Sequence, residues 1–489
     1  MPVKKTPMRD LVVLIPGIMG SVLQKDGQDL FALSWSAGWS ALFSGGSSLQ
    51  QIMLSEDDSC GKDLGDGITA TRLMSDAHLI PGFFKIDGYS RISDFIKSNF
   101  DVIQGDVHDG TKPANYFEFP YDWRRDNKCA ALKLETLINE RLPQWQQSSG
   151  NLHAKVVLIG HSMGGLVSRY YLEMLEGWKN CRALITFGTP YRGSVNALDF
   201  LANGYKKRFI DLTEVLRSFT SAYQLLPVYK VVDAGGGYQY IEDVRDIPGI
   251  DLKRAATARL DFHGAIKQAV EAHQKDADYL KSYKIVPIVG TRQPTLQSAS
   301  FVNGKITASY EVPSNDPADQ VFAEGDGTVP RLSATPYELS DEYRETFFAE
   351  RHASLQNNDN VLTDLSNRLR QMQTSLKKFL GTPPPSPTAA AQPAISLQLD
   401  DLYLADEPVV LHVNLINVSK QIDETPPTAR ISQADSAGTT IERQFQRVNN
   451  EWELVCDPLT PGPYRVEVFS SEFVAGAPSP VHDIFEVLS

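Results

Sequence analysis

The sequence predicts an α/β fold built on a mostly parallel sheet, followed by a separate all-β unit. Apolar runs of β character alternate with helical patterns over residues 1–380. A proline-rich stretch, 381–393, has no means of packing and reads as a linker. After it, over 394–489, short alternating segments recur between turn signals, which is typical of an antiparallel, Ig-like sandwich.

Four apolar runs are the candidate strands of the first unit. They are Leu11–Ile15, Val156–Ile159, Ala183–Phe187 and Ile285–Val289. Strands buried on both faces read as continuous apolar runs, so a parallel sheet covered by helices on both faces is expected. The chain of 489 residues, 42% of them hydrophobic, can bury more than one core.

Charge and composition exclude several classes of function. The net charge of −13 argues against a nucleic-acid partner, because phosphates would be repelled. The apolar run that ends at Ile15 is too short for a secretory signal, and no run approaches a bilayer span. Four scattered cysteines lack metal-ligand spacing: Cys60, Cys129, Cys181 and Cys456. We expect free buried thiols, no metal, no cofactor and a cytoplasmic protein.

The most informative motif is Gly160-His-Ser-Met-Gly164, which follows an apolar run and opens an amphipathic segment. A strand, a sharp turn and a helix are implied. A serine on such a strained elbow projects its hydroxyl from the edge of the sheet, and the glycines make room for the crossing. Ser162 is therefore the candidate nucleophile, provided that the chain also supplies an acid and a base.

The acid and the base follow Ser162 in the order that α/β-hydrolases use. Asp326 lies in the glycine-flanked turn Gly325-Asp-Gly-Thr-Val-Pro330, although an ordinary Asp-Gly turn would read the same way. His352 follows it and precedes a long amphipathic helix. His263 and His273 precede Asp326 in a polar helical pattern, where surface or packing roles fit better. We expect His352 to activate Ser162 and Asp326 to orient His352.

An oxyanion formed at Ser162 needs backbone donors. One is the N–H of Met163, the residue after the nucleophile. The second is expected in Pro16-Gly-Ile-Met-Gly-Ser21, after the first strand, where Ile18 is the preferred donor and Met19 the alternative. A plain structural turn would also explain Pro16-Gly17.

Several blocks of the first unit together resemble the lecithin:cholesterol acyltransferase and lysosomal phospholipase A2 family. In chain order they are Pro16-Gly-Ile-Met-Gly-Ser21, Pro120-Tyr-Asp-Trp-Arg124, Gly160-His-Ser-Met-Gly164, Phe187-Gly-Thr-Pro-Tyr-Arg-Gly-Ser194, Leu225-Leu-Pro227 and Gly325-Asp-Gly-Thr-Val-Pro330. The resemblance extends to about Leu380. It implies a lipid-acyl esterase, either a phospholipase A or an acyltransferase, with an oxyanion donor directly after Pro16-Gly17.

The resemblance also implies a membrane-contacting insertion, about 28–80, and a lid, about 204–221. The insertion holds Trp35, Trp39 and Phe43, aromatic residues that suit a lipid interface, although a cap packed on the core is equally consistent. The lid region contains Phe209, which could close over an acyl chain. The block Tyr121-Asp-Trp-Arg124 is expected to form a buried polar and aromatic wall beside the pocket through Asp122 and Trp123, and a purely structural ion pair within the block is equally consistent.

The chain departs from secreted relatives, which carry a signal peptide and a disulfide that pins the membrane-contacting loop. Cys60 has no partner nearby in the sequence. This departure favours a cytoplasmic enzyme that contacts membranes peripherally. The sandwich after the linker is absent from those relatives, and it could dock a protein partner.

The expected function is that of a serine lipase or phospholipase, which cleaves fatty-acyl esters at a lipid surface through an acyl-enzyme on Ser162. A lipid O-acyltransferase would use the same three residues. A carboxylesterase for soluble esters is a further alternative. The remaining hypothesis is a binding or assembly protein that acts through the sandwich.

Overall fold

The computed structural model describes residues 4–30, 51–54, 60, 64–80, 84–207, 210–314, 316–339, 346–374, 379, 392–434, 440–449, 451–470 and 476–488. Four of the expected lipid-contacting residues lie outside these ranges: Trp35, Trp39, Phe43 and Phe209. Most of the expected linker, 381–391, also lies outside them.

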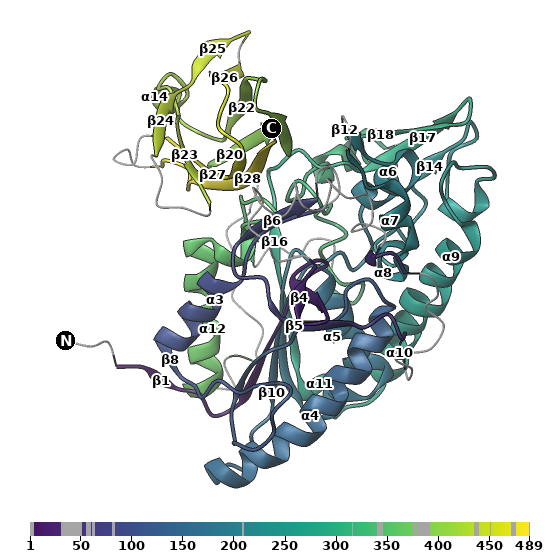
Figure 1. Ribbon diagram of the computed structural model, residues 1–489, viewed down its shortest axis with the longest axis vertical. Helices are drawn as coiled ribbons and strands as arrows, with labels where there is room; N and C mark the ends of the chain where they lie inside the picture. Colours follow the sequence, from purple (N-terminus) through teal and green to yellow (C-terminus); the bar gives the residue numbers. More distant parts are fainter. Residues whose placement is uncertain are drawn as a thin grey trace.

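A six-stranded parallel sheet forms the centre of the molecule (Figure 1). Its order is β19-β16-β11-β10-β2-β9. The strands are β2 (Leu11–Ile15), β9 (Tyr116–Glu118), β10 (Val156–His161), β11 (Cys181–Phe187), β16 (Lys284–Gly290) and β19 (Phe347–Phe348). All four predicted apolar runs lie in this sheet, and β2 and β10 are buried along their whole length. The prediction of a mostly parallel α/β fold is confirmed.

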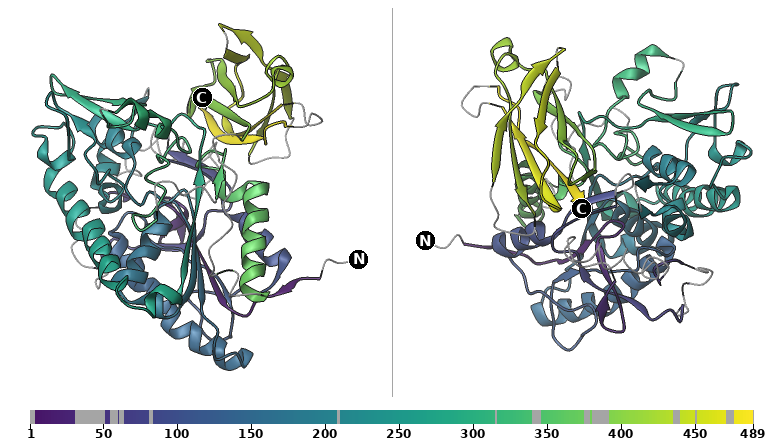
Figure 2. Two further views of the ribbon diagram at one scale, coloured as in Figure 1. Left: turned by 180° about the vertical axis from the view of Figure 1, so that it is seen from behind. Right: turned by 45° about the horizontal axis from the view of Figure 1, so that its top comes forward.

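Helices cover both faces of the sheet (Figures 1 and 2). On one side α3 (Ser90–Asn99) packs with α12 (Asp359–Thr374), and on the other α5 (Met163–Met174) packs between α4 (Asn127–Ser149) and α10 (Ala265–His273). The shorter helices are α6 (Val195–Asn203), α7 (Thr213–Ser218), α8 (Thr220–Tyr223), α9 (Leu252–Thr257), the π-helical turn Ala258–Gly264 and α11 (Tyr279–Ser282). Within the described part of the chain, no helix combines the length and the apolar character that crossing a bilayer requires.

Small sheets surround the central one, mostly in the segments that the sequence assigned to insertions. In the region of the expected cap, β3 (Ser21–Lys25) pairs with β4 (Gln28–Asp29) and β5 (Ile68–Leu73), and β6 (Ala77–Ile80) pairs with β7 (Phe84–Asp87). The expected lid contains the short hairpin β12 (Lys206–Lys207) and β13 (Ile210–Asp211), followed by α7. A further sheet joins β14 (Val232–Asp233), β15 (Tyr238–Gln239), β17 (Ser298–Val302) and β18 (Lys305–Ser309).

In the described residues after the linker, the chain forms strands and one helical turn, α14 (Lys420–Asp423). One sheet has the order β20-β22-β26-β25 and the other β21-β28-β27-β23-β24. The strands are β20 (Ala394–Leu399), β21 (Leu402–Leu404), β22 (Val409–Ile416), β23 (Thr428–Gln433), β24 (Ile441–Gln444), β25 (Gln446–Val448), β26 (Glu451–Cys456), β27 (Gly462–Phe469) and β28 (Val481–Leu488). Their inward side chains share one apolar cluster. The all-β character is confirmed, whereas the Ig-like type and the domain boundaries stay predictions.

This C-terminal unit packs on the α/β domain (Figure 2). Leu402 and Ile484 belong to the same buried cluster as the core of the α/β domain. Polar contacts between Lys85 and Asp483 and between Asp87 and Arg465 add to that interface. The two units therefore share an interface with an apolar centre and buried ion pairs.

The expectation of free thiols is wrong for two of the four cysteines. Cys60 and Cys129, which are 69 residues apart, form a disulfide. Cys129 lies in the first turn of α4, and the Cα atoms of the two cysteines are 4.6 Å apart. Cys181 and Cys456 are free and buried, as expected. Cysteine usage thus no longer supports a cytoplasmic location, which stays a prediction.

Candidate active site

Ser162 occupies a sharp turn between β10 and α5. Its backbone φ is +51°, a left-handed value that costs a non-glycine residue about 1–3 kcal/mol. Three hydrogen bonds hold this conformation: the Ser162 N–H donates to the Phe187 carbonyl, and the Ser162 carbonyl accepts from the Gly165 N–H and the Thr189 hydroxyl. The strain places the hydroxyl at the carboxyl end of the parallel strands, where the loops of an α/β sheet meet.

The structure brings the three predicted residues together. The Ser162 Oγ lies 3.0 Å from Nε2 of His352, and Nδ1 of His352 lies 2.7 Å from Oδ2 of Asp326. The second oxygen of Asp326 accepts the backbone N–H groups of Thr328 and Val329, and the His352 N–H donates to the Asp326 carbonyl. All three side chains are buried. This arrangement can deprotonate a serine, because His352 can take the proton while the carboxylate stabilises the resulting cation.

Two glycines allow the acid and the base to meet. A Cβ on Gly188 would lie 2.7 Å from Oδ2 of Asp326 and 2.8 Å from Nδ1 of His352. A Cβ on Gly290, at the end of β16, would lie 2.4 Å from the Cβ of Asp326. Gly188 also has a φ of +55°. The role of each glycine could not be inferred from the sequence, because it depends on side chains more than 30 positions away.

The expected oxyanion donors lie beside Ser162. Met163 begins α5, so its N–H has no partner within the helix, and the positive end of the helix dipole points toward a developing anion. Gly164 packs against the other donor loop, because a Cβ there would lie 2.4 Å from the Pro16 carbonyl oxygen. In that loop Gly20 donates to Gly17, which closes a turn with Ile18 and Met19 at its corners.

Two groups of that loop are already engaged. The Gly17 N–H donates to the Tyr89 hydroxyl at 2.7 Å, and the Pro16 carbonyl accepts from the Tyr121 hydroxyl. Gly17 is thereby removed as a donor to an oxyanion. Ile18 remains the preferred donor and Met19, whose φ is +59°, the alternative.

A buried tyrosine and a buried histidine link the oxyanion loop to His352. The Tyr89 hydroxyl lies 2.9 Å from Nδ1 of His161, and Nε2 of His161 lies 3.3 Å from the His352 carbonyl oxygen. Burial, with His352 nearby, holds the pKa of His161 well below its ordinary value, so the ring is neutral. Because the His352 carbonyl can only accept, Nε2 of the neutral ring carries the hydrogen, and Nδ1 therefore accepts from the Tyr89 hydroxyl.

The residues of the expected wall make structural contacts. Trp123 is fully buried and donates from its indole nitrogen to the Ser21 carbonyl. Asp122 pairs with Arg124 at 2.7 Å, and Arg124 also reaches Asp66. These contacts join the strand that begins at Ser21 to the rest of the domain. A substrate-contacting role for Asp122 and Trp123 stays a prediction.

The two histidines set aside by chain order lie elsewhere. His263 is buried and hydrogen-bonds the Gln224 carbonyl through Nε2, while burial lowers its pKa to about 4. His273 bonds Glu173 at the far end of α5. Both are packing residues.

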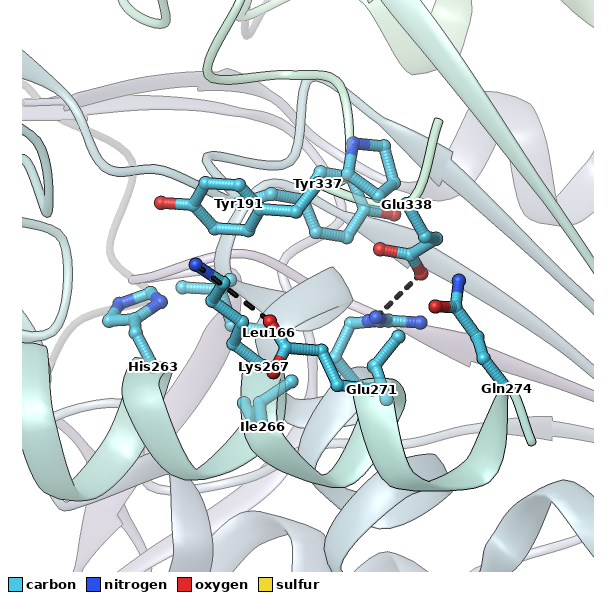
Figure 3. Close-up of a pocket in the computed structure, with 12 residues that line it drawn as sticks. Leu166, Tyr191, His263, Ile266, Lys267, Glu271, Gln274, Tyr337 and Glu338 are labelled. Atoms are coloured by element: carbon cyan, nitrogen blue, oxygen red, sulfur yellow. Dashed lines mark ion pairs between the residues drawn. The ribbon is translucent and has the colours of Figure 1, made fainter. Parts of the chain in front are cut away.

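A cavity of about 280 Å³ lies between α5 and α10 (Figure 3). Leu166 and His263 line it, together with Arg169 and Glu338, which form an ion pair. Ser162, Asp326 and His352 are not among its lining residues. We therefore do not assign this cavity as the binding site for the substrate of Ser162.

Comparisons with known proteins agree with these features. Residues 81–237 match the model of the family described as lecithin:cholesterol acyltransferase. The matched stretch contains Ser162 and the block around Trp123 and ends before Asp326. This part of the chain is similar to the lecithin:cholesterol acyltransferase and lysosomal phospholipase family.

Individual relatives give the same family. The chain is 28% identical over 229 residues to the lysosomal phospholipase A and acyltransferase of Rattus norvegicus, covering 43% of this chain and 49% of the relative. It is 25% identical over 234 residues to the phosphatidylcholine-sterol acyltransferase of Gallus gallus, covering 44% and 51%. The chain thus spans about half the length of these family members. Among solved structures, the propeptide form of the Bacillus licheniformis lipase BlEst2 is 13% identical, covers 99% of this chain and 95% of its own, and has a TM-score of 0.30.

Proposed function

We propose that the chain is a serine esterase that cleaves fatty-acyl esters of lipids, with Ser162 as the nucleophile. The chain of hydrogen bonds from Ser162 through His352 to Asp326, at the edge of a parallel sheet, is the main support for this proposal. Similarity to relatives that are named phospholipases and acyltransferases supports a lipid ester as the substrate.

The proposed reaction has two halves. His352 takes the Ser162 proton as the hydroxyl oxygen attacks the ester carbonyl, and Asp326 stabilises the protonated imidazole. The tetrahedral oxyanion accepts hydrogen bonds from Met163 and Ile18, and loss of one such donor raises the barrier by roughly 3 kcal/mol. His352 then protonates the departing alcohol, which leaves an acyl group on Ser162. Water, activated by the same imidazole, attacks the acyl-enzyme and releases a fatty acid.

An acyltransferase reaction uses the same residues and differs only in the second half. A lipid alcohol in place of water would accept the acyl group from Ser162. The names of both relatives include acyl transfer, which favours testing this outcome directly. Incubation with a competing alcohol separates the two reactions, because transfer yields a new ester and hydrolysis yields a free fatty acid.

The decisive experiment compares the wild-type chain with Ser162→Ala on a mixed phospholipid and neutral-lipid extract. The wild type should release fatty acid or form a new ester, and the variant should do neither while unfolding at the same temperature. A fluorophosphonate probe should label the wild type alone. Equal activity of the two proteins would refute the proposal, and failure of the probe in the presence of lipid vesicles would favour a binding protein.

Membrane association and substrate form are tested with the same preparation. An enzyme for lipid surfaces should gain activity when its ester is presented in vesicles or micelles, and it should sediment with vesicles. An enzyme for soluble esters should act equally on monomeric substrate and remain in the supernatant.

A further inference from the structure

The C-terminal unit contacts the loops that carry both the acid and the base. Strand β28 supplies His482 and Asp483 to the loop of His352, and strand β20 supplies backbone groups to Gln293, which in turn bonds the residue before Asp326. Glu350 and Arg351 make the first contact and lie within two positions of His352, whereas Gln293 makes the second and is distant in sequence from Asp326. Neither was visible in the sequence, where the sandwich carried no catalytic grouping.

The contact on the base side is made by Glu350, two residues before His352. Its carboxylate is fully buried and accepts from the His482 N–H and from the His482 ring at 2.8 Å. It also accepts from the side chain of Asn358 and the Arg351 N–H. A buried carboxylate that loses donors pays a large desolvation penalty. The loop conformation therefore depends on a strand of the other unit.

Arg351, directly before His352, makes the second contact on this side. Its Nε lies 2.5 Å from Oδ2 of Asp483, and its Nη1 donates to the Leu397 carbonyl. Asp483 is 1% exposed and also pairs with Lys85 at 2.9 Å. Arg351, the residue next to the candidate base, is thus bonded to both β28 and β20.

The contact on the acid side is made by Gln293. Its side-chain amide donates to the Ile395 carbonyl at 2.9 Å and accepts from the Leu397 N–H at 3.0 Å, as a neighbouring strand would. The Gln293 N–H in turn donates to the carbonyl of Gly325, the residue before Asp326. Gln293 is buried, so water does not replace these bonds.

From these contacts we infer that the C-terminal unit is a positioning element of the active site, which holds Asp326 and His352 at the separation that their hydrogen bond requires. Glu350, Arg351 and Gln293 act as positioning residues that touch neither Ser162 nor the ester. The unit is thereby part of the catalytic scaffold, and its removal would loosen the acid and the base together. This inference rests on the proposed function, because it concerns the same three side chains.

Two substitutions in the full chain test this inference. Gln293→Leu removes both bonds to β20 without changing charge, and Asp483→Asn weakens the contact with Arg351. Each should lower kcat on a short, water-soluble ester about tenfold or more while KM changes less than twofold, because small misplacements of catalytic groups cost up to about 100-fold. The rate of fluorophosphonate labelling should fall in parallel.

The matched control is Asp423→Asn. Asp423 pairs with Arg447 at 3.1 Å inside the C-terminal unit and has no contact with the α/β domain in the described part of the chain. Its kcat should stay within twofold of the wild type. Rates are referred to the folded fraction of each protein, measured by thermal unfolding. Hydrogen exchange of the segment 350–354, followed by mass spectrometry, should be faster in both test variants and unchanged in the control.

The outcomes separate this inference from the proposed function. A wild type that neither hydrolyses the ester nor reacts with the probe refutes the proposed function. An active wild type with folded Gln293→Leu or Asp483→Asn variants of unchanged kcat and unchanged exchange refutes the positioning role alone.

Discussion

The Tyr89 hydroxyl lies 2.9 Å from Nδ1 of His161 and also accepts the N–H of Gly17. One buried hydroxyl thereby fixes both the loop of the expected oxyanion donors and the ring that hydrogen-bonds the backbone of His352. Burial raises the pKa of Tyr89 far above its ordinary value, so the hydroxyl stays protonated at all physiological pH values.

Tyr89→Phe should therefore reduce catalysis. The variant leaves the Gly17 N–H and the His161 Nδ1 without their partner, which should cost roughly 1–3 kcal/mol of stability. Because the oxyanion loop and His352 both lose support, we expect kcat to fall about tenfold, measured with a soluble ester. Tyr116→Phe is the control, since its buried hydroxyl bonds Ser93 away from the site. Equal kcat values for the two variants would contradict the role of Tyr89.

Gly188→Ala should separate the acid from the base. Its Cβ would overlap both Asp326 and His352, and its φ of +55° adds strain. Loss of the correct imidazole tautomer in a triad lowers kcat by up to about 10⁴-fold, so we expect a fall of at least about 100-fold. Gly235→Ala carries similar strain at φ +92° in open space, and its kcat should match the wild type. Activity of Gly188→Ala near that of this control would show that the pair tolerates displacement.

The pair of His482 and Glu350 predicts a pH dependence of stability. Burial alone would lower the pKa of His482, but the carboxylates of Glu350 and Glu467 raise it to about 10, from an ordinary value near 6.5. A raised pKa stabilises the fold fully below about pH 6.5, and this contribution is lost as the pH rises through about 10. The unfolding free energy should therefore fall between pH 7 and pH 10. The carboxylate of Asp87 also interacts with His482, and it forms an ion pair with Arg465.

His482→Gln provides the comparison for this pH dependence. The variant cannot change charge, so its unfolding free energy, measured by urea titration at each pH, should fall less steeply than that of the wild type. Identical slopes would mean that His482 does not retain its proton in the folded protein.

The disulfide between Cys60 and Cys129 predicts a defined thiol count. Alkylation of the unfolded, unreduced protein should add two groups, at Cys181 and Cys456, and alkylation after reduction should add four. Closing a loop of this length is worth about 4 kcal/mol in the chain-entropy model, so reduction should lower the unfolding temperature. Cys456→Ser should not affect the response to reductant. Four alkylated thiols before reduction would disprove the pairing.

The sequence was sufficient for features that depend on local pattern and chain order. The apolar runs that end at Ile15 and Ile159 predicted buried parallel strands, because such strands need no polar face. Ser162, Asp326 and His352 could be selected because a glycine-rich elbow, a glycine-flanked turn and a fixed chain order can all be recognised in the sequence itself. The structure places these three side chains within hydrogen-bond distance.

Features that depend on proximity across the fold could not be predicted. Cys60 and Cys129 are separated by 69 residues, so spacing gave no indication of their bond. Glu350 and Asp483 read as ordinary solvated charges, because burial of a charge becomes evident only when its partner on another element is known. The same limit applies to Gly188, whose missing side chain matters only beside His352.

The contact of Glu350 with β28 also sets an order of events during synthesis. A ribosome that adds about 5–20 residues per second completes β28 roughly 15–65 s after Ser162. During that interval the nascent chain has its nucleophile, while the strand that holds the loop of His352 does not yet exist. Given the positioning role proposed above, a nascent chain that has not yet made β28 would be a poor esterase, and activity would rise when β28 packs against the loop of His352.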